Sequence, residues 1–184
     1  MSARPPSITV PKATRGRSAD GRAGGFQEIT WQRFDELTRE LASRLAKSPP
    51  DVVIGIAKGG VFVGGAVAAL LGREFFPVRI SRRSRDRVVR RRPRVFGKMP
   101  AEIKGKRVLV VDDVVASGDT LKLACEQALE AGAKETKSAT LVVHDDGPRP
   151  DWFALETSDL VVFPWDYDVI DDGRFETDPD TAGA

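Results

Sequence analysis

Cysteine and histidine are almost absent from this chain of 184 residues, which contains only Cys125 and His144. A single cysteine excludes a disulfide framework and a four-thiolate zinc site, and a single histidine excludes a multi-histidine metal centre. Long apolar runs are scarce too, because the longest uncharged stretch, 59–72, is shorter than the roughly 20 residues that a membrane-spanning helix needs. The N-terminus lacks the apolar region of a signal peptide. We therefore expect a soluble, cytoplasmic chain without a membrane partner.

The chain has no large excess of positive or negative charge, since its net charge is +2, but the charges are unevenly distributed. The segment 82–94 contains eight arginines and one acid, whereas twelve acids and two arginines follow from residue 145 onward. This clustering predicts an anionic ligand near 82–94, or a basic loop folded against an acidic surface. RNA is the weaker alternative, because aromatic side chains for base stacking are not interleaved with the arginines. Nucleic acid is therefore not expected as a partner.

The length and a hydrophobic content of 41% indicate one domain with its own core. Residues 1–25 are rich in proline and glycine and are predicted to form a disordered basic tail. Residues 26–175 are predicted to form the folded domain, and 176–184 an acidic flexible tail. The arginine-rich start is similar in composition to a transit peptide, but an amphipathic apolar face is missing.

Apolar residues recur in patterns that alternate between helix and strand. Thr30 is predicted to cap an amphipathic helix that ends at Pro49-Pro50, and a second helix runs through Leu71. A third helix is predicted over 118–131. The predicted strands are 52–57, 75–80, 107–111, 138–143 and 160–163. This alternation predicts an α/β fold, with a mostly parallel twisted sheet flanked by helices on both faces. The polar segment 82–101 is predicted to be a flexible loop above the sheet.

In an open parallel sheet, ligands bind beyond the carboxyl ends of the strands. The predicted strand 107–111 delivers two adjacent acids, Asp112 and Asp113, to that end. The turn that follows offers hydroxyl groups and a glycine before a helix begins, and a helix N-terminus with free N–H groups binds phosphate. Two acids disfavour phosphate but suit the two hydroxyls of a sugar diol. A single helix cap would not need both acids, and a Walker A loop is missing. The pattern therefore predicts binding of a ribose 5-phosphate.

The segment 108–120 resembles the phosphoribosyl pyrophosphate signature of type I phosphoribosyltransferases. Within that family the chain is most similar to the xanthine-guanine and hypoxanthine enzymes of purine salvage, on the evidence of 56–60 and 162–166. The resemblance extends over 30–168. It implies transfer of a 5-phosphoribosyl group from phosphoribosyl pyrophosphate to hypoxanthine, guanine or xanthine, with Mg²⁺ as cofactor, by a homodimer or homotetramer. Two alternatives remain: a transferase for adenine or another heterocycle, and a non-catalytic regulator that binds phosphoribosyl pyrophosphate.

The resemblance also implies which residues form the site. Phosphoribosyl pyrophosphate would be bound by Ala57, Lys58, Gly59, Gly60, Asp112, Asp113, Ala116, Ser117, Gly118, Asp119 and Thr120. Magnesium would be held by Asp166 together with Asp112 and Asp113. Lys58, Arg82 and Arg83 would be catalytic, the arginines belonging to a hood loop that closes over the reaction. The base would contact His144, Phe163 and Trp165.

Two positions depart from the pattern of the 6-oxopurine enzymes. Ala116 stands where those enzymes usually have an aspartate that meets the purine N7. In lacking this aspartate, the chain resembles the adenine and orotate branches of the family. His144 stands where they usually have a lysine that reads the purine O6. A neutral histidine donates one hydrogen bond and accepts another, so it can still read a base edge. These departures leave the acceptor base open.

Overall fold

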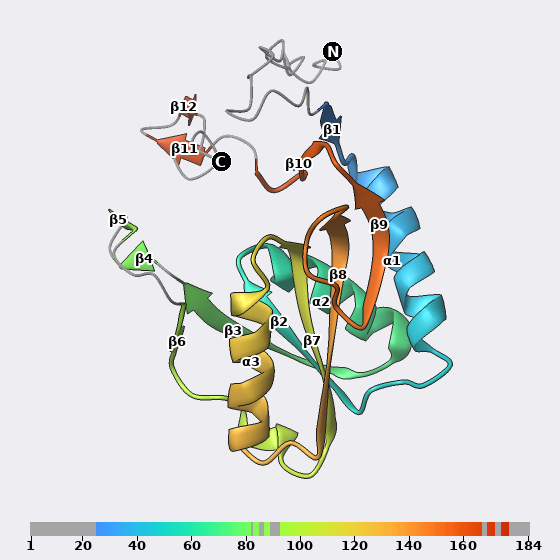
Figure 1. Ribbon diagram of the computed structural model, residues 1–184, viewed down its shortest axis with the longest axis vertical. Helices are drawn as coiled ribbons and strands as arrows, with labels where there is room; N and C mark the ends of the chain where they lie inside the picture. Colours follow the sequence, from blue (N-terminus) through green and yellow to red (C-terminus); the bar gives the residue numbers. More distant parts are fainter. Residues whose placement is uncertain are drawn as a thin grey trace, which may run out of the picture.

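The protein is described by a computed structural model that covers residues 25–81, 83–84, 87–88, 93–166, 169–171 and 174–176. Its centre is a six-stranded sheet with the order β6-β3-β2-β7-β8-β9 (Figure 1). The strands are β6 (Arg94–Phe96), β3 (Glu74–Ser81), β2 (Val52–Ala57), β7 (Arg107–Val115), β8 (Glu135–His144) and β9 (Trp152–Thr157). All neighbours pair in parallel except β6, which is antiparallel to β3. The predicted α/β class is confirmed.

Helices cover both faces of this sheet. They are α1 (Trp31–Leu45), α2 (Gly59–Leu71) and α3 (Asp119–Glu130). As predicted, α1 begins at Thr30, whose Oγ1 accepts a hydrogen bond of 3.1 Å from the Arg33 N–H. Leu109 of β7 packs with α1 and α2, whereas Val110 packs with α3 on the opposite face. Burial on both faces explains why the inner strands are continuously apolar.

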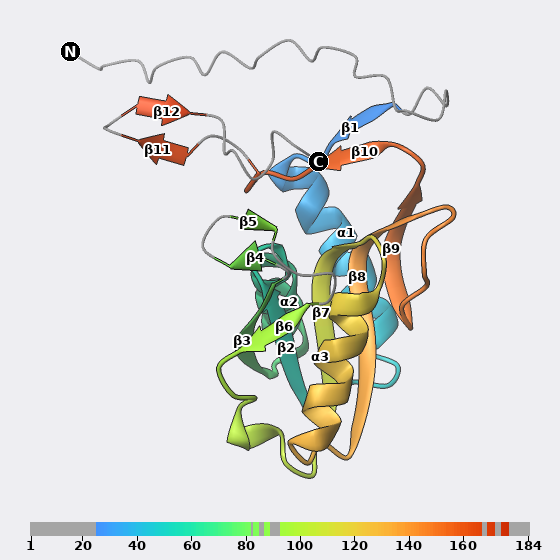
Figure 2. The same ribbon diagram turned by 60° about the vertical axis from the view of Figure 1, so that its left-hand side comes forward.

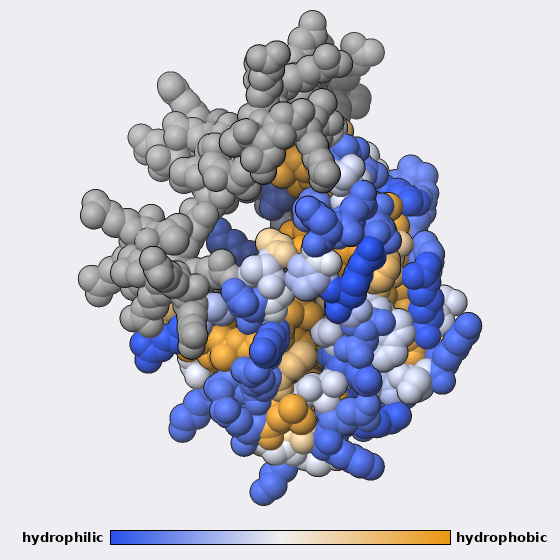
Figure 3. All heavy atoms as spheres, in the orientation of Figure 1, coloured by the Kyte–Doolittle hydropathy of each residue, from blue (hydrophilic) through white to orange (hydrophobic). Residues whose placement is uncertain are grey.

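The outer surface of the face seen in Figure 3 is mainly hydrophilic, with apolar groups showing between polar side chains. Among the described residues, no helix is long and apolar enough to cross a membrane.

The last predicted strand belongs to a different sheet from the one expected. β10 (Leu160–Val162) pairs in parallel with β1 (Phe26–Glu28), and these two form a separate sheet. The fifth parallel strand of the central sheet is instead β9, which the sequence did not reveal. β9 lies at the sheet edge, and most of its side chains are only half-buried. An edge strand needs no continuous apolar run, so its pattern is weak.

The β1–β10 pair lies beyond the carboxyl ends of β7 and β8 (Figures 1 and 2). The Ile29 N–H donates to the Val162 carbonyl at 2.9 Å, and the Gly25 N–H donates to Asp159 Oδ1 at 2.8 Å. The described chain thus begins with Gly25, the last residue of the predicted tail. The rest of that tail, and the predicted tail 176–184 beyond Glu176, lie outside the described residues.

The predicted loop 82–101 contains short strands. β6 pairs with β3, and Val95 packs partly buried against the core on the α3 face. The expectation of an irregular loop is therefore wrong for 94–96, where one apolar residue among charged ones anchors a strand. β4 (Arg83–Ser84) and β5 (Arg87–Val88) form a small antiparallel pair (Figure 2). Closure of this segment over a bound ligand stays a prediction.

Candidate active site

The two predicted acids lie inside β7, near its carboxyl end, because the strand continues to Val115 rather than ending at 111. Successive side chains of a strand point to opposite faces. Asp113 therefore shares the α2 face with Leu109, and Asp112 shares the α3 face with Val110. Trp165 Nε1–H donates to Asp113 Oδ2 at 3.3 Å. The acid pair thus borders both sides of the strand end.

The two predicted glycines pack directly on this acid pair. They begin α2 immediately after the Ala57–Lys58 peptide, which is cis. A Cβ atom at Gly59 would lie 1.6 Å from Asp113 Oδ2, and one at Gly60 would lie 2.5 Å from the Val111 carbonyl oxygen. Both positions therefore favour glycine because of this contact with β7, which the sequence did not predict. The approach of an anion to the same backbone stays a prediction.

Burial raises the pKa of both acids. For Asp112, burial has the largest effect and the neighbouring charge of Asp113 adds to it. For Asp113, burial is again the main cause and the charge of Asp166 adds to it, although hydrogen bonds from the Val114 N–H and Trp165 lower its pKa. Carboxylates in this setting gain from hydroxyl donors or a cation, which favour the charged form. The acid pair is therefore suited to a ribose diol.

A cavity of about 160 Å³ opens beside Asp112 at the start of α3. Its lining comprises Asp112, Val114, Val115, Ala116, Ser117, Gly118, Thr120 and Leu121. Gly118 precedes α3 with φ of +75°, a left-handed conformation that favours glycine and turns the chain into the helix. Of the predicted segment 116–120, only Asp119 is outside this lining; it accepts a hydrogen bond of 3.1 Å from the Ser117 hydroxyl. Hydroxyls and a helix start around one cavity suit a phosphate group.

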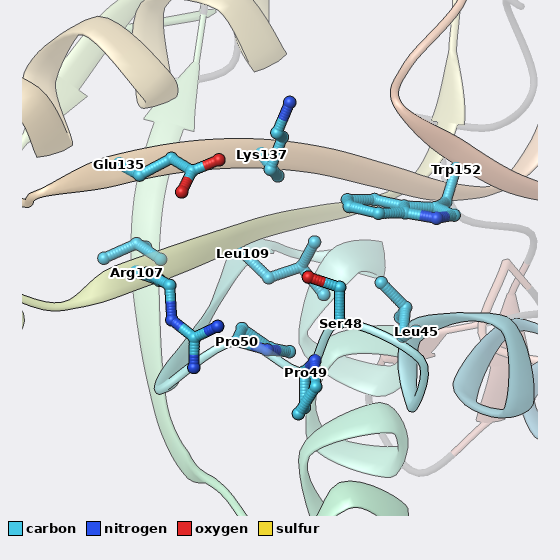
Figure 4. A pocket seen from close by; sticks show the side chains of 10 residues that line it. Leu45, Ser48, Pro49, Pro50, Arg107, Leu109, Glu135, Lys137 and Trp152 are labelled. Carbon is cyan, nitrogen blue, oxygen red and sulfur yellow. The ribbon is translucent and has the colours of Figure 1, made fainter.

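A second, smaller cavity of about 50 Å³ lies at the opposite end of the sheet, where β7 and β8 begin (Figure 4). Arg107 and Lys137 line it, but both side chains are engaged in ion pairs. Arg107 Nη2 lies 2.8 Å from Asp51 Oδ1, and Lys137 Nζ lies 3.2 Å from Asp151 Oδ1. Because both of these cations are already paired, this cavity is a weaker candidate for an anion than the one beside Asp112.

His144 ends β8 and is half-buried. Its Nδ1 lies 3.2 Å from the Thr157 carbonyl oxygen of β9. A carbonyl oxygen can only accept, so this contact assigns the ring proton to Nδ1 and leaves Nε2 of the neutral ring as an acceptor. The predicted base-reading residue is therefore also a link between two strands.

Trp165 stacks parallel to two phenyl rings. Its centroid is 4.6 Å from that of Phe62 and 4.8 Å from that of Phe163, with interplanar angles of 3° and 5°. Phe163 itself is 2% exposed. Both rings are thus packed within an aromatic cluster, and their contact with a base stays a prediction. The sequence analysis did not identify Phe62 as a neighbour of Trp165, although its place in the first turn of α2, beside the predicted site, is a signal for this contact.

The third predicted metal ligand, Asp166, closes a turn. Its Oδ2 accepts the Phe163 N–H at 2.9 Å, and its charge contributes to the raised pKa of Asp113. Among the described residues, no three Asp, Glu, His or Cys side chains gather as a ready-made metal site. A sparse set of carboxylate oxygens nevertheless fits Mg²⁺, which typically takes one or two carboxylates and completes its shell with phosphates and water.

The predicted catalytic cations are less well defined. Lys58 is exposed directly before α2. Arg82 lies outside the described residues, and the description of Arg83 is limited to its backbone in β4.

Comparison with known proteins agrees with this geometry. Residues 28–172 match the family model of the phosphoribosyl transferase domain, and the chain belongs to this family. It is 34% identical over 129 residues to an adenine phosphoribosyltransferase of Kineococcus radiotolerans, covering 64% of this chain and 70% of that protein. It is 25% identical over 117 residues to an orotate phosphoribosyltransferase of Saccharolobus solfataricus, covering 64% of this chain and 56% of that protein.

Solved structures show the same fold. A purine phosphoribosyltransferase from Pyrococcus horikoshii superposes with a TM-score of 0.69 at 30% identity, covering 80% of this chain and 99% of that one. A xanthine-guanine-hypoxanthine phosphoribosyltransferase from Helicobacter pylori superposes with a TM-score of 0.62 at 17% identity, covering 76% and 92%. The second likeness concerns the fold alone.

Proposed function

We propose that this chain transfers the 5-phosphoribosyl group of phosphoribosyl pyrophosphate to a purine base and releases pyrophosphate. The observation that carries the proposal is the position of Asp112 and Asp113 between the glycine start of α2 and the cavity at the start of α3. The acids match the ribose diol. The cavity matches the 5-phosphate, and the backbone of 57–60 is left for the pyrophosphate. The three parts of one substrate thus have three adjacent partners.

In this reaction the bond from ribose C1 to the pyrophosphate oxygen breaks, and its electron pair leaves with pyrophosphate. A purine ring nitrogen forms the new bond to C1, and its proton passes to water or to the departing pyrophosphate. The chain contributes by orienting both substrates and by presenting N–H donors to the departing group. Lys58, with the predicted Arg82 and Arg83, would add positive charge there. When bound through Asp112, Asp113 and Asp166, Mg²⁺ would neutralise charge that develops on pyrophosphate.

The acceptor base that we favour is adenine, in contrast to the 6-oxopurine expected from the sequence resemblance. At purine C6, adenine carries an amino group that donates, whereas hypoxanthine, guanine and xanthine carry an oxygen that accepts. Nε2 of His144 is an acceptor while Nδ1 donates to Thr157, so it complements the amino group. Ala116 and the similarity to the adenine phosphoribosyltransferase of Kineococcus radiotolerans also favour adenine.

A panel of acceptor bases tests this proposal. The purified chain is incubated with Mg²⁺, phosphoribosyl pyrophosphate and one of adenine, hypoxanthine, guanine, xanthine or orotate, and the nucleotide formed is quantified. We expect turnover with purines and the highest kcat/KM with adenine. Preference for a 6-oxopurine would keep the purine activity and refute the adenine assignment, whereas preference for orotate would refute both.

Variants of His144 are expected to change the ranking of bases. His144→Ala should lower kcat/KM for adenine by up to about tenfold, the loss of one hydrogen bond to a neutral group, without changing affinity for phosphoribosyl pyrophosphate. His144→Lys replaces the acceptor by a donor and should shift preference toward hypoxanthine and guanine. Relative turnover on the panel measures both effects. If melting temperatures fall but the ranking stays the same, His144 only links β8 to β9.

A non-catalytic regulator that binds phosphoribosyl pyrophosphate is the second candidate. The observation in its favour is Ala116, because the obvious proton acceptor near the purine is then missing. Such a protein would bind the substrate without consuming it, which is a measurable distinction.

A further inference from the structure

The indole of Trp165 makes a polar contact that its place among aromatic rings does not require. Its Nε1–H donates to Asp113 Oδ2 at 3.3 Å, across a sequence separation of 52 residues. The other oxygen, Oδ1, accepts the Val114 N–H at 2.8 Å. Both oxygens of Asp113 are therefore tethered, one by its own strand and one by the segment that follows β10.

Asp113 also has little room to move on the α2 side. A single carbon atom added at Gly59 would lie 1.6 Å from Oδ2 and 2.3 Å from Cγ. With α2 on one side and two N–H donors on its oxygens, the carboxylate is held in one orientation. Each oxygen keeps a further lone pair for a ligand hydroxyl.

The orientation of the indole is itself fixed by its neighbours. Phe62 and Phe163 lie parallel to its ring plane, and Phe34 meets it edge-on with centroids 5.3 Å apart. Parallel and edge-on arrangements are the favourable geometries for aromatic pairs, so these contacts hold the indole in place. The N–H of Trp165 is thereby directed at Asp113 by rings from α1, from α2 and from the segment after β10.

We propose that Trp165 is a positioning residue for phosphoribosyl pyrophosphate, acting through Asp113 rather than through the base. Trp165 fixes the Asp113 carboxylate in the orientation that accepts a ribose hydroxyl. The carboxylate is therefore already ordered before the ligand binds. This inference rests on the proposed function, because it assigns the ribose to Asp113. A residue that stacked on the base would affect binding of the base, whereas this role affects binding of phosphoribosyl pyrophosphate.

The test removes the N–H and keeps an aromatic ring. We expect Trp165→Phe to raise both the KM and the calorimetric Kd for phosphoribosyl pyrophosphate about tenfold, while the KM for the base stays within about twofold. Trp31→Phe is the matched control, because Trp31 belongs to the same cluster, meets Phe34 and Phe62 at steep angles and is 56% exposed. It should leave both constants unchanged.

A double-mutant cycle separates positioning from general destabilisation. In an Asp113→Ala background, Trp165→Phe should cause no further loss of affinity, because the residue through which it acts is gone. If Trp165→Phe folds poorly, benzothienylalanine at position 165 keeps the ring size with sulfur in place of N–H and should give the same tenfold effect.

Three results would overturn the inference alone, and a fourth would refute it together with the proposed function. Equal affinity of Trp165→Phe and Trp31→Phe for phosphoribosyl pyrophosphate would mean that the N–H does not matter. A raised KM for the base alone would assign Trp165 to the base. Losses that add in the double mutant would show that Trp165 acts independently of Asp113. Failure of the wild-type chain itself to bind phosphoribosyl pyrophosphate would refute the proposed function together with the inference.

Discussion

Replacing Gly59 by alanine is expected to lower affinity for phosphoribosyl pyrophosphate by about tenfold or more, the effect of losing a hydrogen bond to a charged group. The new methyl group would overlap the Asp113 carboxylate, since the two would be 1.6 Å apart. The methyl group would push the carboxylate out of the orientation that its two N–H donors hold. Because the displaced atoms are the end of a side chain, the fold should survive while the ribose partner moves. Calorimetric titration of both proteins with phosphoribosyl pyrophosphate measures the effect.

Two other glycines of α2 make this prediction specific. Gly65 has room for a methyl group, because the nearest atom to its Cβ position is 4.0 Å away, in Phe75. Gly65→Ala should leave the affinity unchanged and stabilise the helix by about 0.5–1 kcal/mol. At Gly60 the obstacle is backbone, so Gly60→Ala should destabilise the fold by about 1–3 kcal/mol. Equal affinities for Gly59→Ala and Gly65→Ala would show that contact between α2 and Asp113 is unimportant for binding.

Neutralising either acid should weaken substrate binding strongly. Asp112→Asn and Asp113→Asn each remove the charge from a group expected to accept a ribose hydroxyl, which typically costs about 1.5–3 kcal/mol, or roughly 10- to 150-fold in Kd. Calorimetry on the two variants measures this loss. Wild-type affinity in both would remove the assignment of the ribose diol to this pair.

Asp112→Asn should also raise the melting temperature of the free protein. Burial raises the pKa of Asp112 above its ordinary value of 3.8, so an ionised Asp112 is less favourable in the folded state than in the unfolded chain. A group whose pKa is raised by folding contributes stability that is fully present below its pKa in the unfolded chain. This stability is lost as the pH rises through its pKa in the folded protein. Asparagine does not ionise, so the variant does not lose stability in this way. Melting temperatures measured from pH 4 to pH 8 should therefore fall less for the variant than for the wild type. A lower melting temperature at neutral pH would contradict this explanation.

The sequence predicted the inner strands better than it predicted the sheet edges. The Thr30 cap and the inner strands follow from short-range periodicity, and the acids after an apolar run identify the binding end of the sheet. β9 and the β1–β10 pair were missed or misplaced because edge strands are half-exposed, and because pairing between 26–28 and 160–162 depends on contacts distant in sequence.

Contacts across the site were the other limit. That Gly59 must be small because Asp113 lies against it, and that Trp165 reaches the same acid, depend on three segments meeting in space. Spacing along the chain carries no signal for such contacts. The same holds for His144, whose acceptor nitrogen is defined only by its partner Thr157 on the neighbouring strand.

Release of pyrophosphate from phosphoribosyl pyrophosphate is the most direct test of the proposed activity. The purified chain, Mg²⁺ and phosphoribosyl pyrophosphate are combined with and without a purine, and pyrophosphate and nucleoside monophosphate are quantified together, with Asp113→Asn as the matched control. We predict that pyrophosphate appears only when a purine is present, in equal amount to the nucleotide, and far more slowly with the variant. Tight binding of phosphoribosyl pyrophosphate without release of pyrophosphate for any base would contradict the transferase and identify a binding protein instead.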